Sequence, residues 1–85
     1  MYLVTYDLKK PGQDYKDLHE AMKARGTWWH YLESTWLLKT SLSASQIFER
    51  LRPYLDANDL ILIVRVLPND KSGWLPQDAW NWINS

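Results

Sequence analysis

The chain has 85 residues, with ten Lys and Arg, ten Asp and Glu, no cysteine, six tryptophans and five tyrosines. A chain of this length forms one domain and buries only about 60–65% of its unfolded surface, which excludes a deep two-domain cleft unless a second copy supplies one wall. The zero net charge argues against a protein that coats duplex DNA, because phosphate neutralisation needs an excess of cations. The lack of cysteine excludes disulfides, thiolate-ligated zinc and thiol catalysis.

The beginning of the sequence and its hydropathy bear on location. Met1–Thr5 contains neither a basic region nor a long apolar run, so we expect no signal peptide. No apolar stretch approaches the roughly 20 residues that a membrane span needs. We therefore expect a cytoplasmic protein with no membrane partner.

A change of hydrophobic period predicts the first strand and the first helix. Residues 2–7 alternate aromatic and β-branched side chains, as in a half-buried strand, and Lys9–Gly12 has the composition of a turn. From Asp14 the spacing becomes helical, with Asp14 as N-cap and Gly26 as the C′ residue of a helix of about three turns. Its apolar stripe consists of Tyr15, Leu18 and Met22.

A β-hairpin and a second helix follow. Residues 27–32 and 34–40 are rich in Trp, Tyr, Thr and Leu and predict two strands joined by a short turn. Ser43 and Gln46 have the spacing of a capping box, which indicates where the helix begins. Pro53 should end or kink this helix, because its ring clashes with the carbonyl four residues earlier.

The last predicted elements are an aliphatic strand and a short helix. Residues 59–67 are almost wholly aliphatic apart from Arg65, which is typical of a strand that is buried on both faces. Pro76 lies where a proline is favoured in the first turn of a helix, and it predicts a short C-terminal helix.

This order of elements is that of the split βαβ fold. We predict an α+β, ferredoxin-like domain over residues 1–85. Its βαββαβ core, residues 1–67, forms a four-stranded antiparallel sheet with helices on one face, and residues 68–85 are a C-terminal extension with a short helix. The strands carry apolar residues at both odd and even positions, so both faces of the sheet are apolar. We therefore expect the second face to be covered by another copy of the chain, in a homodimer.

Asp7 is the first candidate site residue. It ends the first strand at an odd position, as Leu3 and Thr5 do, which places it at the rim of the face away from the helices. On a two-fold axis it would meet its own copy, and two carboxylates could hold magnesium through their oxygens. The alternative is a loop-edge aspartate that caps the following turn.

The run Trp28-Trp29-His30-Tyr31, together with Trp36, is the second candidate. Alternation puts Trp28 and His30 on one face of the sheet, and Trp29 and Tyr31 on the other. Aromatic rings stack on nucleobases, and each such contact is worth about 1–3 kcal/mol. The alternative is that these residues form core and dimer interface, where tryptophan and tyrosine are also enriched.

The histidines and two cations complete the candidates. His30 is a possible general base or phosphate ligand, because histidine changes its charge near neutral pH. His19 lies off the apolar stripe of its helix and is expected to be solvated. Arg65 interrupts an apolar strand, so its charge must reach an edge, an acid or an anionic ligand. Lys39, on the hairpin, is either a ligand contact or simply solvated.

Short motifs spread over residues 1–67 resemble a set of bacterial and phage proteins identified as SinR-like, within the superfamily of small CRISPR-associated adaptation proteins. The motifs are Tyr6-Asp7-Leu8-x-x-Pro11-Gly12, Trp28-Trp29-His30, Ser34-Thr35-Trp36, Leu38-Lys39-Thr40 and Ala57-Asn58-Asp59. Only the strand that ends in Tyr-Asp is shared with the wider superfamily. The resemblance implies a homodimer of the split βαβ fold whose aspartates, here Asp7, face each other across the two-fold as metal ligands of a nuclease. The chain departs from those relatives in lacking a basic surface and in filling its hairpin with tryptophan, which argues against binding of duplex DNA.

Three functions follow as hypotheses. In the first, two chains form an aromatic cleft at the dimer interface that binds a nucleotide or short RNA, and Asp7, Lys39 and Arg65 contact its polar and phosphate groups. In a phage or defence setting, such a dimer could sequester a nucleotide signal. In the second, paired Asp7 carboxylates and magnesium form an endoribonuclease. In the third, the dimer is purely structural or a protein-interaction adaptor. The first is favoured, because a neutral protein suits a small nucleotide better than a long polyanion.

Overall fold

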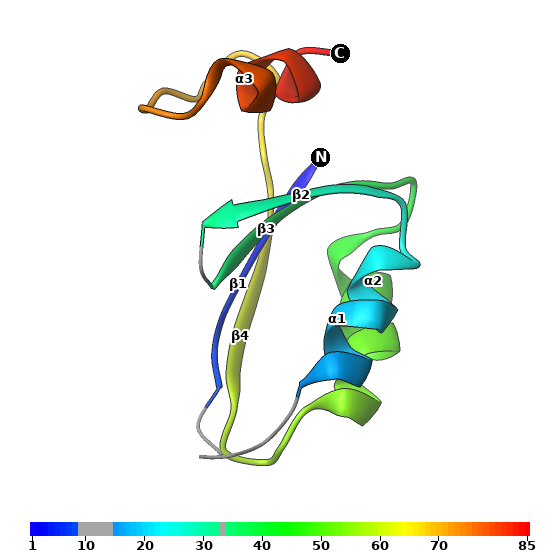
Figure 1. The fold of residues 1–85 in the computed structure, drawn as a ribbon. Coiled ribbons are helices and arrows are strands. Elements are labelled where there is room, and N and C mark those ends of the chain that lie inside the picture. The colour runs from blue at the N-terminus through cyan, green and yellow to red at the C-terminus, as the bar shows by residue number, and fades with distance from the viewer. Residues whose placement is uncertain (9–14, 33) are drawn as a thin grey trace.

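The computed structural model describes residues 1–8, 15–32 and 34–85, and for Tyr31 the backbone alone. In chain order the elements are β1 (Tyr2–Asp7), α1 (Lys16–Lys23), β2 (Thr27–Leu32), β3 (Thr35–Lys39), α2 (Ala44–Leu51), a 3₁₀ turn (Arg52–Tyr54), β4 (Leu60–Arg65) and α3 (Gln77–Ile83). The strands form one antiparallel sheet in the order β2-β3-β1-β4. This confirms the predicted α+β architecture, with the ferredoxin-like order and a C-terminal helix (Figure 1). Within the described ranges no helix is long and apolar enough to span a bilayer.

The main core lies between one face of the sheet and the two helices α1 and α2 (Figure 1). Even-numbered residues of β1 and β3 point into this layer, and their neighbours point away, because side chains alternate along a strand. Its largest fully buried side chains are Trp36, Leu18, Met22, Leu38, Ile47, Leu51 and Val4. A slip of one residue in strand pairing would turn each of the strand residues out of the core, so burial of this layer fixes the register.

The start of α1 differs from the prediction. The helix begins at Lys16, with Tyr15 in the N-cap position and no side-chain cap, and it ends at Lys23. The predicted N-cap, Asp14, and the predicted turn at Lys9–Gly12 lie outside the described residues.

The start of α2 confirms the predicted capping box. The Ser43 hydroxyl accepts a hydrogen bond from the Gln46 backbone N–H at 3.1 Å, and the Gln46 side-chain oxygen accepts one from the Ser43 N–H at 2.9 Å. Pro53 lies in the 3₁₀ turn that follows Leu51, the last residue of the helix. Both ends of α2 are therefore set by local sequence.

β4 differs from the expectation of a strand buried on both faces. It is an edge strand, and within one chain only its helix-facing side chains, Ile61 and Ile63, pack against the core. Leu60, Leu62 and Val64 face the other way and are 60%, 59% and 45% exposed. We call these three residues the open strip. The aliphatic run shows that both sides of β4 are apolar, but one chain covers only one of them.

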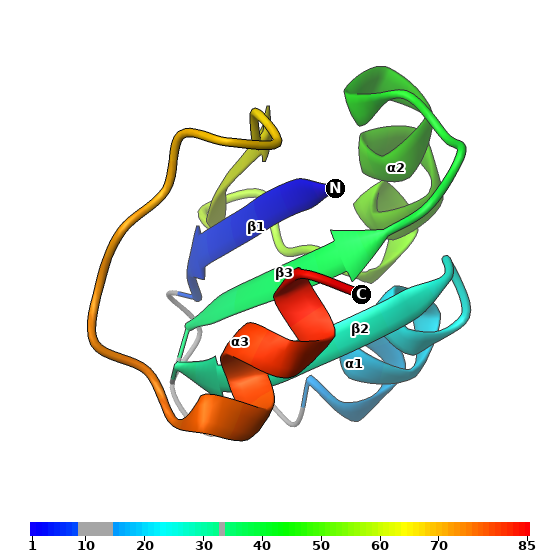
Figure 2. The same cartoon turned by 90° about the horizontal axis from the view of Figure 1, so that it is seen from above.

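The C-terminal helix α3 lies against the face of the sheet opposite α1 and α2, over β2 and β3 (Figure 2). Trp29 of β2 points to this face and is only 5% exposed. The face is thus divided, since α3 covers its β2–β3 half and the open strip on β4 remains exposed.

Gly26 follows α1 and is required by a close approach of two backbone segments. The C-cap of α1 is Ala24, so Gly26 lies one residue beyond the C′ position predicted for it. Its φ is +157°, and a Cβ placed on it would lie 2.0 Å from the carbonyl oxygen of Lys39. Only glycine allows β2 to begin so close to the end of β3.

Replacement of Gly26 by alanine should lower the free energy of unfolding by about 2 kcal/mol or more, because the backbone must move to relieve this overlap. Chemical denaturation measures the loss. Gly73→Ala is the matched control, since a Cβ at Gly73 meets no atom within 4 Å and should change stability by no more than about 0.5 kcal/mol. Equal stabilities of the two variants would contradict the proposed role of Gly26.

Candidate functional site

The aromatic residues of the hairpin are divided between the two faces of the sheet, as alternation predicts. Trp28, His30 and Trp36 point to the layer of α1 and α2, where they contact one another. Trp29 points to the layer of α3. The side chain of Tyr31 lies outside the described residues. The five aromatic candidates therefore do not form one cleft within a chain.

On the helix side, Trp36 is the centre of an aromatic cluster. It is 1% exposed, and its indole N–H donates to the Tyr6 hydroxyl at 3.1 Å. His30 stacks on it with ring centroids 4.0 Å apart and an interplanar angle of 14°. Trp28 packs 5.2 Å from it and is 41% exposed, with the Lys23 ammonium 5.2 Å from its ring centre. Trp36 is thus a core residue, and Trp28 is the accessible tryptophan of this cluster.

His19 belongs to the same cluster, so the expectation that it is simply solvated is wrong. Its Nε2 lies 3.2 Å from the Tyr6 hydroxyl, and its ring centre lies 5.8 Å from that of Trp36 and 6.2 Å from that of His30. The side chain is half-buried because its position on α1 turns it towards the hairpin. The rings of Tyr6, His19, His30 and Trp36 therefore contact one another and form one cluster.

Lys39 anchors the C-terminal helix. Its Nζ donates to the backbone carbonyl of Trp82 and, at 3.2 and 2.8 Å, to the carbonyl and the hydroxyl of Ser85. The ammonium also lies 4.4 Å from the centre of the Trp82 ring. A cation is favourable at a helix C-terminus, where the backbone carbonyls point outwards. The three donors of this ammonium are thus directed at the end of α3.

Arg65 satisfies the expectation that its charge must reach an edge or a polar partner. It lies at the end of the edge strand β4, where its guanidinium donates to the Tyr2 hydroxyl at 2.7 Å. The guanidinium carbon is 5.1 Å from the centre of the Tyr2 ring, which allows a cation–π contact. Tyr2 itself is buried, so it holds Arg65 in a fixed position.

Asp7 is exposed at the end of β1, on the face predicted for it. It pairs with Leu60 in the ladder with β4 and lines a shallow hollow together with Thr5 and Leu62. Residues 1–8, 15–32 and 34–85 contain no group of three His, Asp or Glu side chains placed to hold a metal ion.

An apolar cavity lies between the sheet and the C-terminal extension. It has a volume of about 330 Å³. Trp29, Leu3 and Leu37 of the sheet line it on one side, Trp80 of α3 lines it on another, and Trp74 lies on the segment that leads into α3. Trp74 is fully exposed. We call this the tryptophan cavity.

Lys71 is the one charged side chain that lines the tryptophan cavity within the described part of the chain. Its ammonium donates to the carbonyl of Pro68. A cavity with tryptophan walls and one cation at its edge has the chemistry to bind a flat aromatic molecule that carries an anionic group.

Sequence reasoning identified Trp29 but not Trp74, Trp80 or Lys71. The available signal was weak, because three tryptophans near the C-terminus are equally compatible with a helix that packs on its own sheet or on that of a partner. Comparison of the chain with protein-family models, with curated proteins and with solved structures gives no match.

Proposed function

We propose that this protein is a binding module that takes a flat aromatic ligand, of the nucleobase type, into the tryptophan cavity. The observation that carries the proposal is the set of three tryptophans from separate parts of the chain, Trp29, Trp74 and Trp80, around one apolar cavity. In contrast to the sequence-based hypothesis, this aromatic site is made by one chain and uses Trp29 rather than the whole hairpin run.

The size and chemistry of the cavity support this ligand class. Its volume of about 330 Å³ falls at the lower end of the range of about 300–1,000 Å³ for small-molecule sites. Stacking of a base on an aromatic side chain is worth about 1–3 kcal/mol per contact. One lysine, Lys71, at the edge suits one phosphate and not a chain of them. A mononucleotide, or the end of a short RNA, fits these properties better than a long polyanion does.

Trp74→Ala should weaken binding of a mononucleotide such as AMP or GMP about 5- to 150-fold, which is the loss of one stacking contact. Because Trp74 is fully exposed, the variant should keep the stability of the parent chain. Isothermal titration calorimetry measures the affinity.

Trp28→Phe is the control for this experiment, since Trp28 is also an exposed tryptophan but lies on the helix side of the sheet. It should bind the nucleotides as the parent does. Failure of the parent chain to bind either mononucleotide, or unchanged affinity in Trp74→Ala, would refute the proposal.

We further propose that the module is a homodimer that packs through the open strip. In a two-fold interface the same surface of each copy packs against its counterpart. An uncharged apolar surface can pack on a copy of itself, whereas a surface with a net charge would repel its copy. Leu60, Leu62 and Val64 are such a surface on the half of the face that α3 leaves uncovered. Packing of sheet on sheet would bury all three side chains. Because each is already about half buried, each would contribute roughly half of the 1.5–3 kcal/mol that complete burial of such a side chain provides.

Leu62→Asp should make the protein a monomer, because it places two charges in the centre of the interface. Light scattering coupled to size-exclusion chromatography measures the mass. Leu67→Asp is the matched control, with an equally exposed leucine beyond the end of β4, and it should remain a dimer. A parent chain that is monomeric throughout the concentration range would contradict the interface.

A second candidate function is metal-dependent cleavage of RNA. The observation that favours it is that Asp7 is exposed on the same face as the open strip, next to Leu60 and Leu62. Sheet-on-sheet packing is the arrangement that could bring two Asp7 carboxylates together. They would hold magnesium through their oxygens, and the ion would supply an activated water for attack on a phosphodiester.

Asp7→Asn should abolish magnesium-dependent cleavage of a short RNA without loss of folding or of dimer formation. Cleavage is followed by gel electrophoresis with and without a chelator. Asp17→Asn, at an exposed aspartate on α1, is the control and should cleave normally. If Asp7→Asn folds, dimerises and retains full activity, this second function is excluded.

A further inference from the structure

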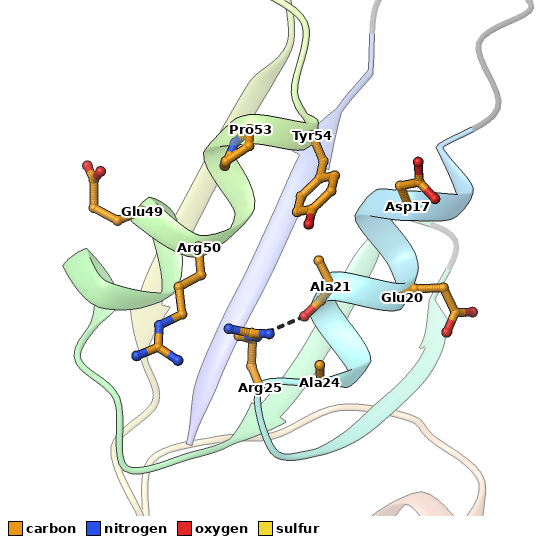
Figure 3. Close-up of a pocket in the computed structure, with 9 residues that line it drawn as sticks. All are labelled: Asp17, Glu20, Ala21, Ala24, Arg25, Glu49, Arg50, Pro53 and Tyr54. Atoms are coloured by element: carbon orange, nitrogen blue, oxygen red, sulfur yellow. Dashed lines mark hydrogen bonds between the residues drawn. The ribbon is translucent and has the colours of Figure 1, made fainter.

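A groove separates α1 from the C-terminal part of α2 on the outer side of the helices (Figure 3). It has a volume of about 650 Å³ and is open to solvent. Ala21 of α1 and Ala24, the C-cap of this helix, lie along its wall, and their small side chains leave the space between the helices unfilled. We call it the arginine groove, after Arg25 and Arg50.

The two arginines reach the groove from opposite sides. Arg25 follows α1 and Arg50 lies in the last turn of α2, and Figure 3 shows both guanidinium groups at the same end of the groove. The Arg25 Nε donates to the backbone carbonyl of Ala21 at 3.0 Å. This bond holds the guanidinium against α1 and leaves its terminal nitrogens as donors for another group.

The acidic residues around the groove do not neutralise these arginines. Glu20 pairs with Lys23 at 3.7 Å, and Glu49 pairs with Arg52 at 3.6 Å. Asp17 lies at the other end of α1, beyond Glu20 (Figure 3).

Within the described residues, neither Arg25 nor Arg50 takes part in an ion pair. Two cations that share one end of a groove repel each other, and an anion between them removes that repulsion.

We propose that the arginine groove binds the phosphate group of a small phosphomonoester. A guanidinium offers parallel N–H donors that match the oxygens of a phosphate, and two guanidinium groups match its double negative charge. Tyr54 lies at the other end of the groove and is 44% exposed, with its hydroxyl directed towards Ala21 (Figure 3). Its ring and that of Pro53 provide apolar surface for the organic part of the ligand.

This site is independent of the proposed function. The tryptophan cavity lies under α3 on one face of the sheet, whereas the arginine groove lies on the helices that cover the other face. The core between them is filled by side chains such as Trp36 and Leu18. One ligand molecule cannot reach both sites at once. A mononucleotide is also a phosphomonoester, so the two sites are distinguished by their variants: Trp74→Ala changes only the tryptophan cavity, and Arg25→Gln changes only the arginine groove.

The test is a calorimetric titration of the full chain with phenyl phosphate and with inorganic phosphate. Arg25→Gln and Arg50→Gln should each weaken phenyl phosphate about tenfold or more, because each removes a charge-assisted pair of hydrogen bonds. Arg65→Gln makes the same change of charge on β4, at an arginine that does not line the groove, and it should weaken binding by less than about twofold.

Two further measurements keep the proposal falsifiable. Arg50→Lys keeps the charge but loses the planar guanidinium with its parallel N–H donors, so it should also weaken binding several-fold. Phenyl phosphate should bind more tightly than inorganic phosphate, because its ring meets Tyr54. No binding of phenyl phosphate to the parent chain, equal losses in Arg25→Gln, Arg50→Gln and Arg65→Gln, or full affinity in Arg50→Lys would each overturn the proposal.

Discussion

The structure depends on how three helices are shared between the two faces of one sheet. α1 and α2 cover one face, and the core between these helices and the sheet holds the large buried side chains. Only α3, seven residues long, is left for the other face. Four strands spaced about 4.8 Å apart make a surface wider than the roughly 10 Å diameter of one helix. α3 therefore covers two strands, and the apolar residues of the other half remain exposed.

Lys39 stabilises α3 over the β2–β3 half of this face. Its ammonium binds the carbonyl end of α3 and lies against the Trp82 ring, so the helix is held over β3 and β2. The chain leaves β4 at the opposite edge of the sheet and must cross to reach this position (Figure 2). The crossing segment carries Lys71 and Trp74 past the sheet. The tryptophan cavity is a consequence of this crossing, because the segment passes over side chains of β1 and β3 that α3 itself does not cover.

The elements, and the placing of Trp28 and His30 on the face opposite to Trp29, could be predicted because their signals are local. The Ser43 capping box and the alternation of residues 2–7 act within a few positions of the chain, and both are confirmed. The tryptophan cavity could not be predicted, because it depends on contacts between residues far apart in the sequence. Trp29 and Trp74 line it together only because Lys39 binds Trp82 and Ser85, which are 43 and 46 residues further along the chain. The surroundings of His19 were missed for a similar reason. The position of His19 next to Leu18 shows that it lies off the apolar stripe of its helix. It does not show that the aromatic residues of the hairpin pack on that side of α1.

The open strip and the tryptophan cavity adjoin at Leu3. Leu3 pairs with Val64 of the open strip on one side and with Leu37 on the other, and it lines the cavity. A second copy packed on the open strip would therefore contact a side chain that a ligand in the cavity also contacts. If each event changes the position of Leu3, ligand binding and dimer formation are linked, and the effect of one on the other must be reciprocal in free energy. The arginine groove shares no residue with either surface, so its ligand should leave both equilibria unchanged while α1 and α2 keep their positions on the sheet.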